Sequence, residues 1–252
     1  MKILHLDVET APNTCYTWGL FNQNVGINQI VKPGYTLCWA AKWGDDPTLM
    51  FDSVNDSSFN DMIGRMWALL DEADAVVHFN GTRFDIPTLN REFVKLGMPL
   101  PSPYHQIDLY RVVRSTFKFA SNKLDWVCQE LGLGSKVHNK GMSLWHECIN
   151  GDSKAWKTMR KYNIQDVKLL PKLYKRLLPW IRVHPNHALY KDTQRPVCTN
   201  CGSHHVVKRG TVTTQTMMYD RYSCTNCGKW LRGRTNILDA DKKASILVGV
   251  AP

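Results

Sequence analysis

The stretch KILHLDVET (2–10) decides the fold of the N-terminal part of the chain. It contains a short run rich in branched apolar residues, which is typical of a buried strand, and two acids near its end, Asp7 and Glu9. Because side chains alternate along a strand, residues two apart lie on the same face. We expect a strand over residues 2–8 that brings both carboxylates to one point. Alone, an Asp-x-Glu pair is also common on a solvated strand end.

Apolar runs that resemble strands and amphipathic runs that resemble helices alternate after this first strand. The expected strands cover 2–8, 35–43, 48–53, 75–79 and 105–109, and the expected helices cover 59–73, about 87–97, 122–132 and 153–181. Ser57 or Ser58 is placed to cap the first helix, and Pro171 predicts a kink or break in the last. The pattern predicts an α/β fold with a mixed sheet and an antiparallel start. No G-x-G-x-x-G follows the first strand, which argues against a dinucleotide-binding fold.

Two further acids lie in stretches that stand out from the rest. Asp85 lies in FNGTRFDIPTL (79–89), between an expected strand and an expected helix, so it could cap the helix, bind a metal ion or do both. Asp166 lies four residues after Tyr162, on the same helical face; the alternative is a core tyrosine beside an exposed aspartate. If the three stretches meet, their four carboxylates can hold two hard divalent cations.

The order and spacing of these motifs resemble the DEDD superfamily of 3′→5′ exonucleases. The pieces that carry the resemblance are D-V-E-T, F-N-G-x-x-F-D-I-P-x-L and Y-x-x-x-D, with NKLDWVCQELGLGSK (122–136) between the last two. They are most similar to the proofreading domain of family B DNA polymerases and its stand-alone phage and bacterial relatives. The resemblance covers about residues 1–180 and implies a ribonuclease H-like sheet flanked by helices. Lys161 stands where the histidine form of the family has His, so Tyr162 indicates the tyrosine form.

The resemblance also implies a role for each residue. Asp7 would bridge two Mg²⁺ or Mn²⁺ ions, and Glu9 and Asp166 would hold the ion that activates a water. Asp85 would bind the second ion partly through water, and Tyr162 would orient the attacking water. Oxygen-only ligands suit Mg²⁺ or Mn²⁺ rather than zinc.

Three other residues lie near these motifs. Asn80 and Phe84 are expected to shape the pocket, with Phe84 either a stacking surface or a core residue. Asp108 is expected to support the site or to cap a helix.

Positive charge is concentrated in the C-terminal part of the chain. The formal net charge of the chain is +10. Residues 1–153 hold 13 Lys/Arg against 17 Asp/Glu. Residues 154–195 hold 11 Lys/Arg against 2 Asp/Glu, and residues 196–252 hold 8 Lys/Arg against 3 Asp/Glu. Such an excess favours a polyanionic partner, because each cation placed on a phosphate releases a counterion. A solvated basic surface is the alternative.

Four of the eight cysteines form two nearly identical pentapeptides, C198-T-N-C201-G and C224-T-N-C227-G. Two C-x-x-C pairs suit one tetrahedral, structural Zn²⁺ held by Cys198, Cys201, Cys224 and Cys227. The segment between them predicts hairpin strands, so the module resembles a zinc ribbon. Its mixture of cations with Tyr219, Tyr222 and Trp230 suits nucleic-acid contact. The alternative is docking to a protein of the replication machinery.

These observations predict a three-part chain. Residues 1–181 are expected to form the exonuclease domain, 182–195 a linker and 196–252 the ribbon domain. The preferred function is a 3′→5′ exonuclease on single-stranded or frayed DNA ends. A ribonuclease of the same fold acting on RNA and a non-catalytic nucleic-acid-binding module are the alternatives. With no apolar run near the ~20 residues that span a bilayer and no secretory signal, the expected location is the cytoplasm.

Overall fold

The computed structural model describes residues 1–44 and 46–250, so the last two residues of the predicted ribbon domain lie outside the described residues. The chain forms two compact units, Met1–Tyr174 and Lys175–Pro252. The division into an exonuclease domain, a linker and a ribbon domain remains a prediction. No helix within the described ranges is long and apolar enough to cross a membrane.

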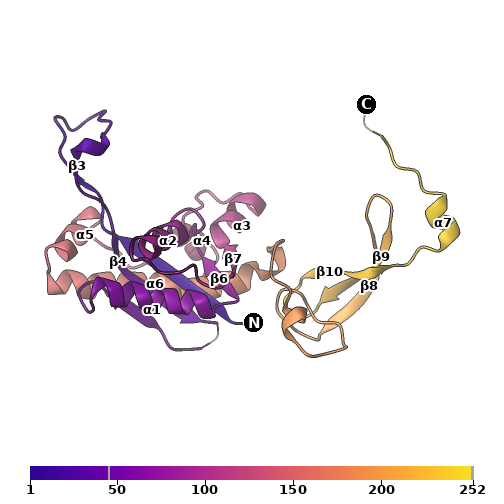
Figure 1. The fold of residues 1–252 in the computed structure, drawn as a ribbon. Helices are drawn as coiled ribbons and strands as arrows, with labels where there is room; N and C mark the ends of the chain where they lie inside the picture. Colours follow the sequence, from indigo (N-terminus) through magenta and orange to yellow (C-terminus); the bar gives the residue numbers. More distant parts are fainter. Residues whose placement is uncertain (45, 251–252) are drawn as a thin grey trace. The chain divides into compact units, whose positions relative to one another are not determined.

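The first unit is built around a five-stranded mixed sheet (Figure 1). Its strand order is β5-β4-β1-β6-β7, with β4 antiparallel to β1 and β5, and with β6 parallel to β1 and β7. The predicted mixed sheet and antiparallel start are therefore confirmed. The strands are β1 (Ile3–Thr10), β4 (Thr36–Trp43), β5 (Met50–Ser53), β6 (Ala75–His78) and β7 (His105–Asp108). The helices are α1 (Phe59–Glu72), α2 (Asp85–Lys95), α3 (Leu109–Thr116), α4 (Leu124–Glu130), α5 (Met142–Ile149) and α6 (Ser153–Leu177).

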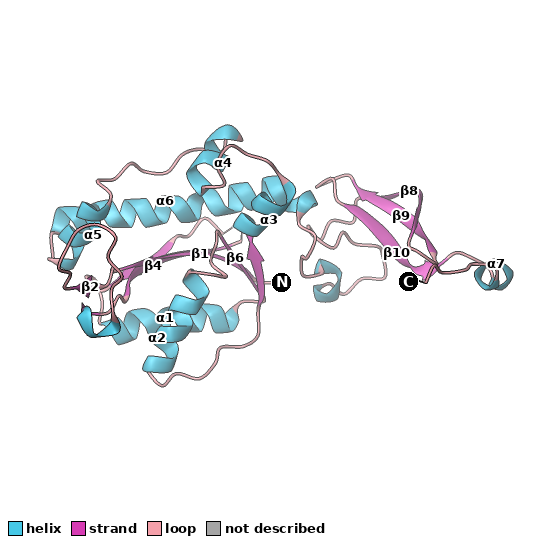
Figure 2. Ribbon diagram, turned by 90° about the horizontal axis from the view of Figure 1, so that it is seen from above, coloured by secondary structure: helices cyan, strands magenta, loops and turns pink. Residues whose placement is uncertain are grey.

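Helices cover both faces of the sheet, α1 and α2 on one side and α6 on the other (Figure 2). The alternation of β1 separates the two faces. Leu4, Leu6 and Val8 pack into the core beneath α1 and α2 and are at most 2% exposed. The intervening positions face α6, so Asp7 and Glu9 point away from that core toward the second layer.

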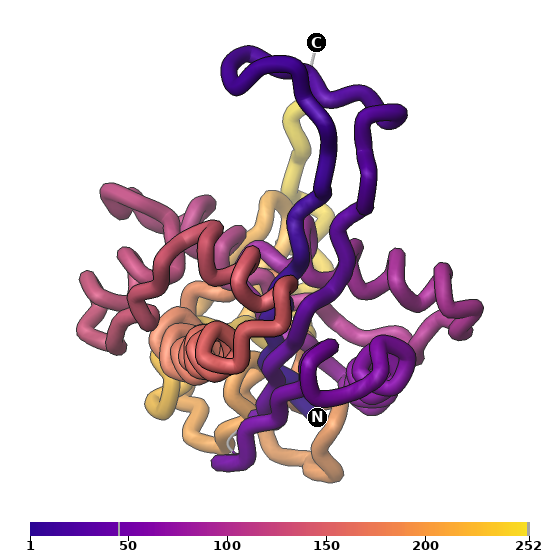
Figure 3. The backbone as a smooth tube through the Cα atoms, turned by 90° about the vertical axis from the view of Figure 1, so that its left-hand side faces the viewer, coloured from indigo at the N-terminus to yellow at the C-terminus, as the bar shows by residue number. Residues whose placement is uncertain are grey.

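A hairpin arm interrupts the chain between β1 and β4. It comprises β2 (Thr14–Cys15), a short 3₁₀ turn (Ile27–Gln29) and β3 (Ile30–Lys32), and it extends outward from the unit (Figure 3). The sequence pattern did not predict it, because its strands are too short to show a period of two. At its base, Ala11 packs with residues of α5 and α6, in a cluster against which Tyr162 also rests.

Helix α6 is continuous through Pro171, so of the kink or break predicted at this proline the break is wrong. Pro171 removes one hydrogen bond of the helical ladder. The turns on either side are nevertheless held in place by burial, since Leu169, Leu170 and Leu173 are at most 1% exposed. Packing of this apolar face offsets the local cost of the missing bond.

The second unit is a three-stranded antiparallel sheet with short helical turns. It contains β8 (Val206–Thr213), β9 (Met218–Cys224) and β10 (Trp230–Asn236) in the order β10-β9-β8, as well as two 3₁₀ turns (Leu178–Trp180 and His187–Tyr190) and α7 (Ala240–Ala244). The segment predicted as hairpin strands forms β8 and β9. The 3₁₀ turn at His187–Tyr190 lies in the stretch predicted as a linker without periodicity.

Candidate active site

The structure brings three of the four predicted carboxylates together. Asp7 and Glu9 from β1 and Asp166 from α6 each place a carboxylate oxygen within 4.8 Å of the others. Asn163, one turn before Asp166, donates through Nδ2 to Asp7 Oδ2 at 2.7 Å. This contact joins the strand to the helix and sets the direction of the Asp7 carboxylate.

Asp85 lies next to this trio but is held differently. It is the first residue of α2 and makes no side-chain cap; Oδ1 instead accepts from the Val8 backbone N–H at 2.9 Å. The contact spans 77 positions and draws the start of α2 to the middle of the sheet beside Asp7. The capping alternative is therefore wrong for Asp85. Asp108 does cap α3, since Oδ1 accepts from Tyr110 N at 3.1 Å.

The turn that leads to Asp85 depends on a glycine at position 81. Its N–H donates to His78 Nδ1 at 3.1 Å, and a Cβ built on it would lie 2.4 Å from His78 Cγ. We expect Gly81→Ala to lower the free energy of unfolding by about 1–3 kcal/mol, because backbone or imidazole must move. Gly64→Ala, within α1 and 3.7 Å from Met98, should raise it by about 0.5–1 kcal/mol. Urea unfolding measures both, and two equal values would contradict the steric role of position 81.

The pKa values of the acids reflect mutual repulsion in a poorly hydrated place. Burial, and then the charges of Asp166, Asp85 and Glu9, raise the pKa of Asp7 well above its usual range. Burial and the charge of Asp166 raise the pKa of Glu9 to about 8, and burial raises that of Asp85 to about 7. Burial also raises the pKa of Asp166, although the nearby Lys136 acts against it. Such a set gains stability when a multivalent cation compensates its charge.

The side chains fit a hard cation. All the converging donors are carboxylate oxygens, the ligand type that Mg²⁺ and Mn²⁺ prefer. Within the described part of the chain, Asp166 Oδ1 is buried without a hydrogen-bond partner, so a lone pair is left for a ligand.

A cleft of about 720 Å³ opens beside these acids. Asn80 lines it, with a positive φ of 69° that turns the chain after β6, and its N–H donates to Asp108 Oδ1 at 2.8 Å. Phe84 is 44% exposed, so the core assignment for it is wrong. The residues lining the cleft are Asp7, Phe79, Asn80, Tyr110, Asn122, Lys123, Leu124, Asp125, Lys136 and Tyr162.

Two residues of the site escaped the sequence reasoning, Lys136 and Asn163. Lys136 forms an ion pair with Asp166 Oδ2, and its Nζ donates to the Tyr162 hydroxyl at 3.2 Å. Burial alone would lower the pKa of Lys136, but Asp166, Tyr162 and Asp7 raise it, so the ammonium stays charged. In the sequence, the one indication of a role for Lys136 is that it ends the stretch 122–136. For Asn163 the sequence offers only its position between Tyr162 and Asp166.

Tyr162 keeps its proton at neutral pH. Burial and the charge of Asp166 raise the pKa of its phenol to about 12. Its ring lies edge-on to Trp145 of α5, with 5.9 Å between centroids. A fixed, protonated phenol beside a carboxylate cluster can hold a water by hydrogen bonding but cannot remove its proton.

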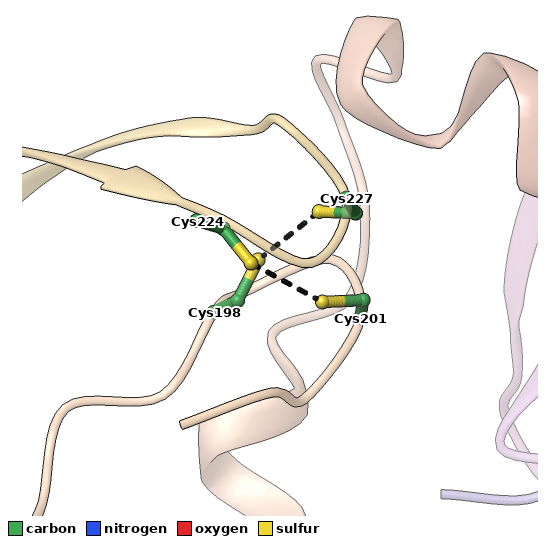
Figure 4. Close-up of side chains that lie close together, drawn as sticks. All are labelled: Cys198, Cys201, Cys224 and Cys227. Atoms are coloured by element: carbon green, nitrogen blue, oxygen red, sulfur yellow. Dashed lines mark hydrogen bonds between the residues drawn. The ribbon is translucent and has the colours of Figure 1, made fainter. Parts of the chain in front are cut away.

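The four paired cysteines converge in the second unit (Figure 4). Their Sγ atoms all lie within 4.8 Å of one another, and the pairs Cys198–Cys227 and Cys201–Cys224 are 3.6 Å apart. A disulfide needs about 2.05 Å, whereas sulfurs 2.3 Å from a tetrahedral Zn²⁺ are about 3.8 Å apart. The cluster is therefore compatible with a zinc ribbon.

The two cysteine loops share one backbone design. In each loop the glycine after the second cysteine has a positive φ, 69° at Gly202 and 80° at Gly228. Its N–H donates to the carbonyl of the first cysteine, at 3.0 Å for Cys198 and 2.9 Å for Cys224. The repeated pentapeptide thus produces two equivalent turns that present their sulfurs to one point.

Comparison with known proteins places the first unit in a family. No curated protein matches the chain. The structure of the family B DNA polymerase from the hyperthermophilic archaeon Pyrobaculum calidifontis has a similar fold, with a TM-score of 0.55 and 19% identity. That similarity covers 71% of this chain and 24% of the polymerase chain, so this chain spans about a quarter of the polymerase's length. The family model of the RNase H superfamily matches residues 4–178, well over half of the chain, and the chain therefore belongs to the RNase H superfamily.

Proposed function

We propose that this protein is a two-metal-ion 3′→5′ exonuclease that hydrolyses phosphodiester bonds of DNA at single-stranded or frayed 3′ ends. The observation that carries the proposal is the convergence of Asp7, Glu9 and Asp166 beside an open cleft. Membership of the RNase H superfamily and the likeness to a polymerase fold support nuclease chemistry. The 3′→5′ direction rests on the motif resemblance.

Each residue has a distinct part in this proposal. Asp7 would hold both cations, Glu9 and Asp166 one of them, and Asp85 the other. Two bound cations stabilise the attacking and leaving oxygens of an in-line displacement. Asn163 fixes the Asp7 carboxylate through its 2.7 Å hydrogen bond. Lys136 keeps Tyr162 and Asp166 at a set separation by contacting both.

The direct test uses end-labelled single-stranded DNA with Mg²⁺. A 5′ label should yield a ladder of shortening fragments, whereas a 3′ label should appear at once in mononucleotides. The reverse pattern would overturn the 3′→5′ direction, and an intact substrate would overturn the nuclease proposal. An RNA oligonucleotide of the same sequence tests the ribonuclease alternative directly.

The Tyr162→Phe variant tests the role of the phenol. It should lower kcat about ten- to hundredfold and leave KM unchanged, since the hydroxyl that would orient the water is lost together with its contact to Lys136. The ring should stay in place because Trp145 packs against it. Tyr104→Phe, in a residue that packs on the α1–α2 core, is the matched control and should cleave like wild type. A wild-type kcat for Tyr162→Phe would remove this residue from the reaction.

We further propose that the cysteine cluster holds one structural zinc ion and that the ribbon helps to bind nucleic acid. On one face of its sheet, cations stack on aromatic rings. Arg221 lies 4.9 Å from the Trp230 ring centre, and Arg232 lies 4.2 Å from that of Tyr219. Arg221 and Arg232 are paired in register, so the two stacks lie side by side on adjacent strands. Guanidinium groups and ring faces together suit phosphates and unpaired bases.

A further inference from the structure

Helix α6 carries positive charge that the proposed reaction does not use. Eight of its nine charged residues are Lys or Arg, and its single acid is Asp166 of the carboxylate cluster. A groove of about 590 Å³ lies along this helix. Four of its seven lining residues are cations: Lys157, Arg160, Lys161 and Lys168.

The cations of this groove are available to a ligand. Lys157, Lys161 and Lys168 are exposed, and within the described part of the chain their ammonium groups form no hydrogen bond or ion pair. Arg160 is exposed as well, but its guanidinium is anchored 5.0 Å above the Phe51 ring. No acid is among the described residues that line the groove. The uncompensated charge therefore selects an anionic ligand with several charges.

The groove adjoins the carboxylate cleft. Val137 lines the groove, whereas its neighbour Lys136 lines the cleft and contacts Tyr162 and Asp166. Gln165, also in the groove, donates through Nε2 to the Ser135 carbonyl at 2.9 Å and so fixes this segment to the helix. The groove and the cleft thus lie on two different faces of α6, and the segment 135–137 passes between them, with Lys136 in the cleft and Val137 in the groove.

The spacing of the lysines suits an extended ligand. Lys157, Lys161 and Lys168 are four and seven residues apart, which places them on one face of the helix. At 1.5 Å per residue the row extends about 16 Å along the axis. A single phosphate would use one end of such a row, whereas a polyanion would use all of it.

We propose that this groove binds the sugar–phosphate backbone of a single-stranded nucleic acid whose 3′ end lies in the cleft. The inference rests on the proposed exonuclease function for the position of the 3′ end. The lysines would contact successive phosphates, and Val137 and Ile164 would lie against the sugars. Contacts of this kind position a strand without reading its sequence.

The test is the salt dependence of binding of a fluorescein-labelled oligothymidylate, with oligouridylate as a second probe for RNA. The full chain is used in an Asp7→Ala background so that the probe stays intact. Compared with that background, Lys157→Gln/Lys161→Gln/Lys168→Gln should bind about a hundredfold more weakly near 0.1 M salt. The slope of log K against log salt should fall by about 2, or about 0.7 for each lost phosphate contact. Lys95→Gln, an exposed cation of α2 that lines neither the groove nor the cleft, is the control and should change the slope little.

A second measurement separates this proposal from the nuclease proposal. With Asp7 restored, the triple variant should cleave the p-nitrophenyl ester of thymidine 5′-monophosphate at the wild-type rate, because this substrate is too short to reach the groove. Equal slopes for the triple variant and the control would overturn the groove proposal, whatever the cleavage result. A wild-type protein that cleaves neither this ester nor single-stranded DNA would overturn the nuclease proposal. The salt slopes would still show whether the groove binds the strand.

Discussion

Replacing Asp7 with asparagine should reduce phosphodiester cleavage about a thousandfold. Asp7 is the acid assigned to both cations, and bound cations contribute several kcal/mol to the transition state; a loss of about 4 kcal/mol corresponds to three orders of magnitude in rate. Asparagine keeps the shape of the side chain and one oxygen for the Asn163 contact. The defect should therefore be one of cation binding. The measurement is kcat at increasing Mg²⁺, and excess Mg²⁺ should recover only part of the rate.

The same substitution should stabilise the protein in the absence of Mg²⁺. Asp7 is disfavoured in its charged form by burial and by Asp166, Asp85 and Glu9, so a neutral amide removes a repulsive group. We expect the free energy of unfolding at neutral pH, measured by urea unfolding without Mg²⁺, to rise, because the unfolded state no longer gains from ionising this group. Loss of activity together with a gain in stability is expected where mutually repelling carboxylates destabilise the cation-free protein and are needed to bind the cations.

Asp52→Asn is the matched control for Asp7→Asn. Asp52 is 5% exposed and forms an ion pair with Arg65 at 2.5 Å, away from the carboxylate cluster. The control should lose about 1 kcal/mol of stability, because the hydrogen-bonded charge is removed, and should keep wild-type cleavage. If Asp7→Asn cleaves like wild type, or if both variants lose stability equally, Asp7 does not hold the cations.

Asp7 and Asp85 show how far a sequence pattern can predict this site, because a local rule places Asp7 whereas a long-range contact places Asp85. Asp7 and Glu9 could be placed on one side of the sheet because the alternation of a strand is a local rule. The fixing contact of Asp85 is with Val8 N–H, a backbone group 77 residues away. No local rule contains that contact, so helix capping and metal binding were equally consistent with the sequence at this position.

Lys136 and Pro171 show two other limits. Lys136 lies in an irregular segment, and its relevance comes only from folding against α6, where it meets Tyr162 and Asp166. Proline in a helix interior usually breaks the helix, but around Pro171 the packing of buried leucines keeps α6 continuous. The cysteine cluster was predictable because a C-x-x-C pair determines its own loop geometry.

Cys201→Ser should abolish zinc binding and unfold the ribbon while the first unit stays folded. The Cys201 Sγ lies 3.6 Å from that of Cys224, in a cluster sized for one tetrahedral ion. The strands β8, β9 and β10 carry mostly exposed or half-exposed side chains, so the sheet has little core of its own. Structural zinc contributes about 10–16 kcal/mol in such modules, more than a small apolar core can supply.

Hydrogen exchange and metal analysis together measure this effect. Wild-type protein should contain one zinc ion per chain, and Cys201→Ser should contain none. Amides of β8–β10 should then exchange at rates near those of an unfolded chain, while amides of β1 and β4 keep their protection. Cys15→Ser is the control, since Cys15 is a lone free cysteine in the hairpin arm, and it should keep both the zinc and the protection.

Two outcomes would argue against a structural zinc ion. One is a wild-type protein purified without zinc, and the other is a Cys201→Ser variant whose ribbon amides remain protected. Cleavage of the short nitrophenyl substrate should survive the substitution, because every residue assigned to the reaction lies in the first unit. Affinity for long single-stranded DNA should fall, because the stacked pairs Arg221–Trp230 and Arg232–Tyr219 require the intact sheet. Unchanged affinity with an unfolded ribbon would leave the groove on α6 as the main contact with the strand and assign the ribbon to a different partner.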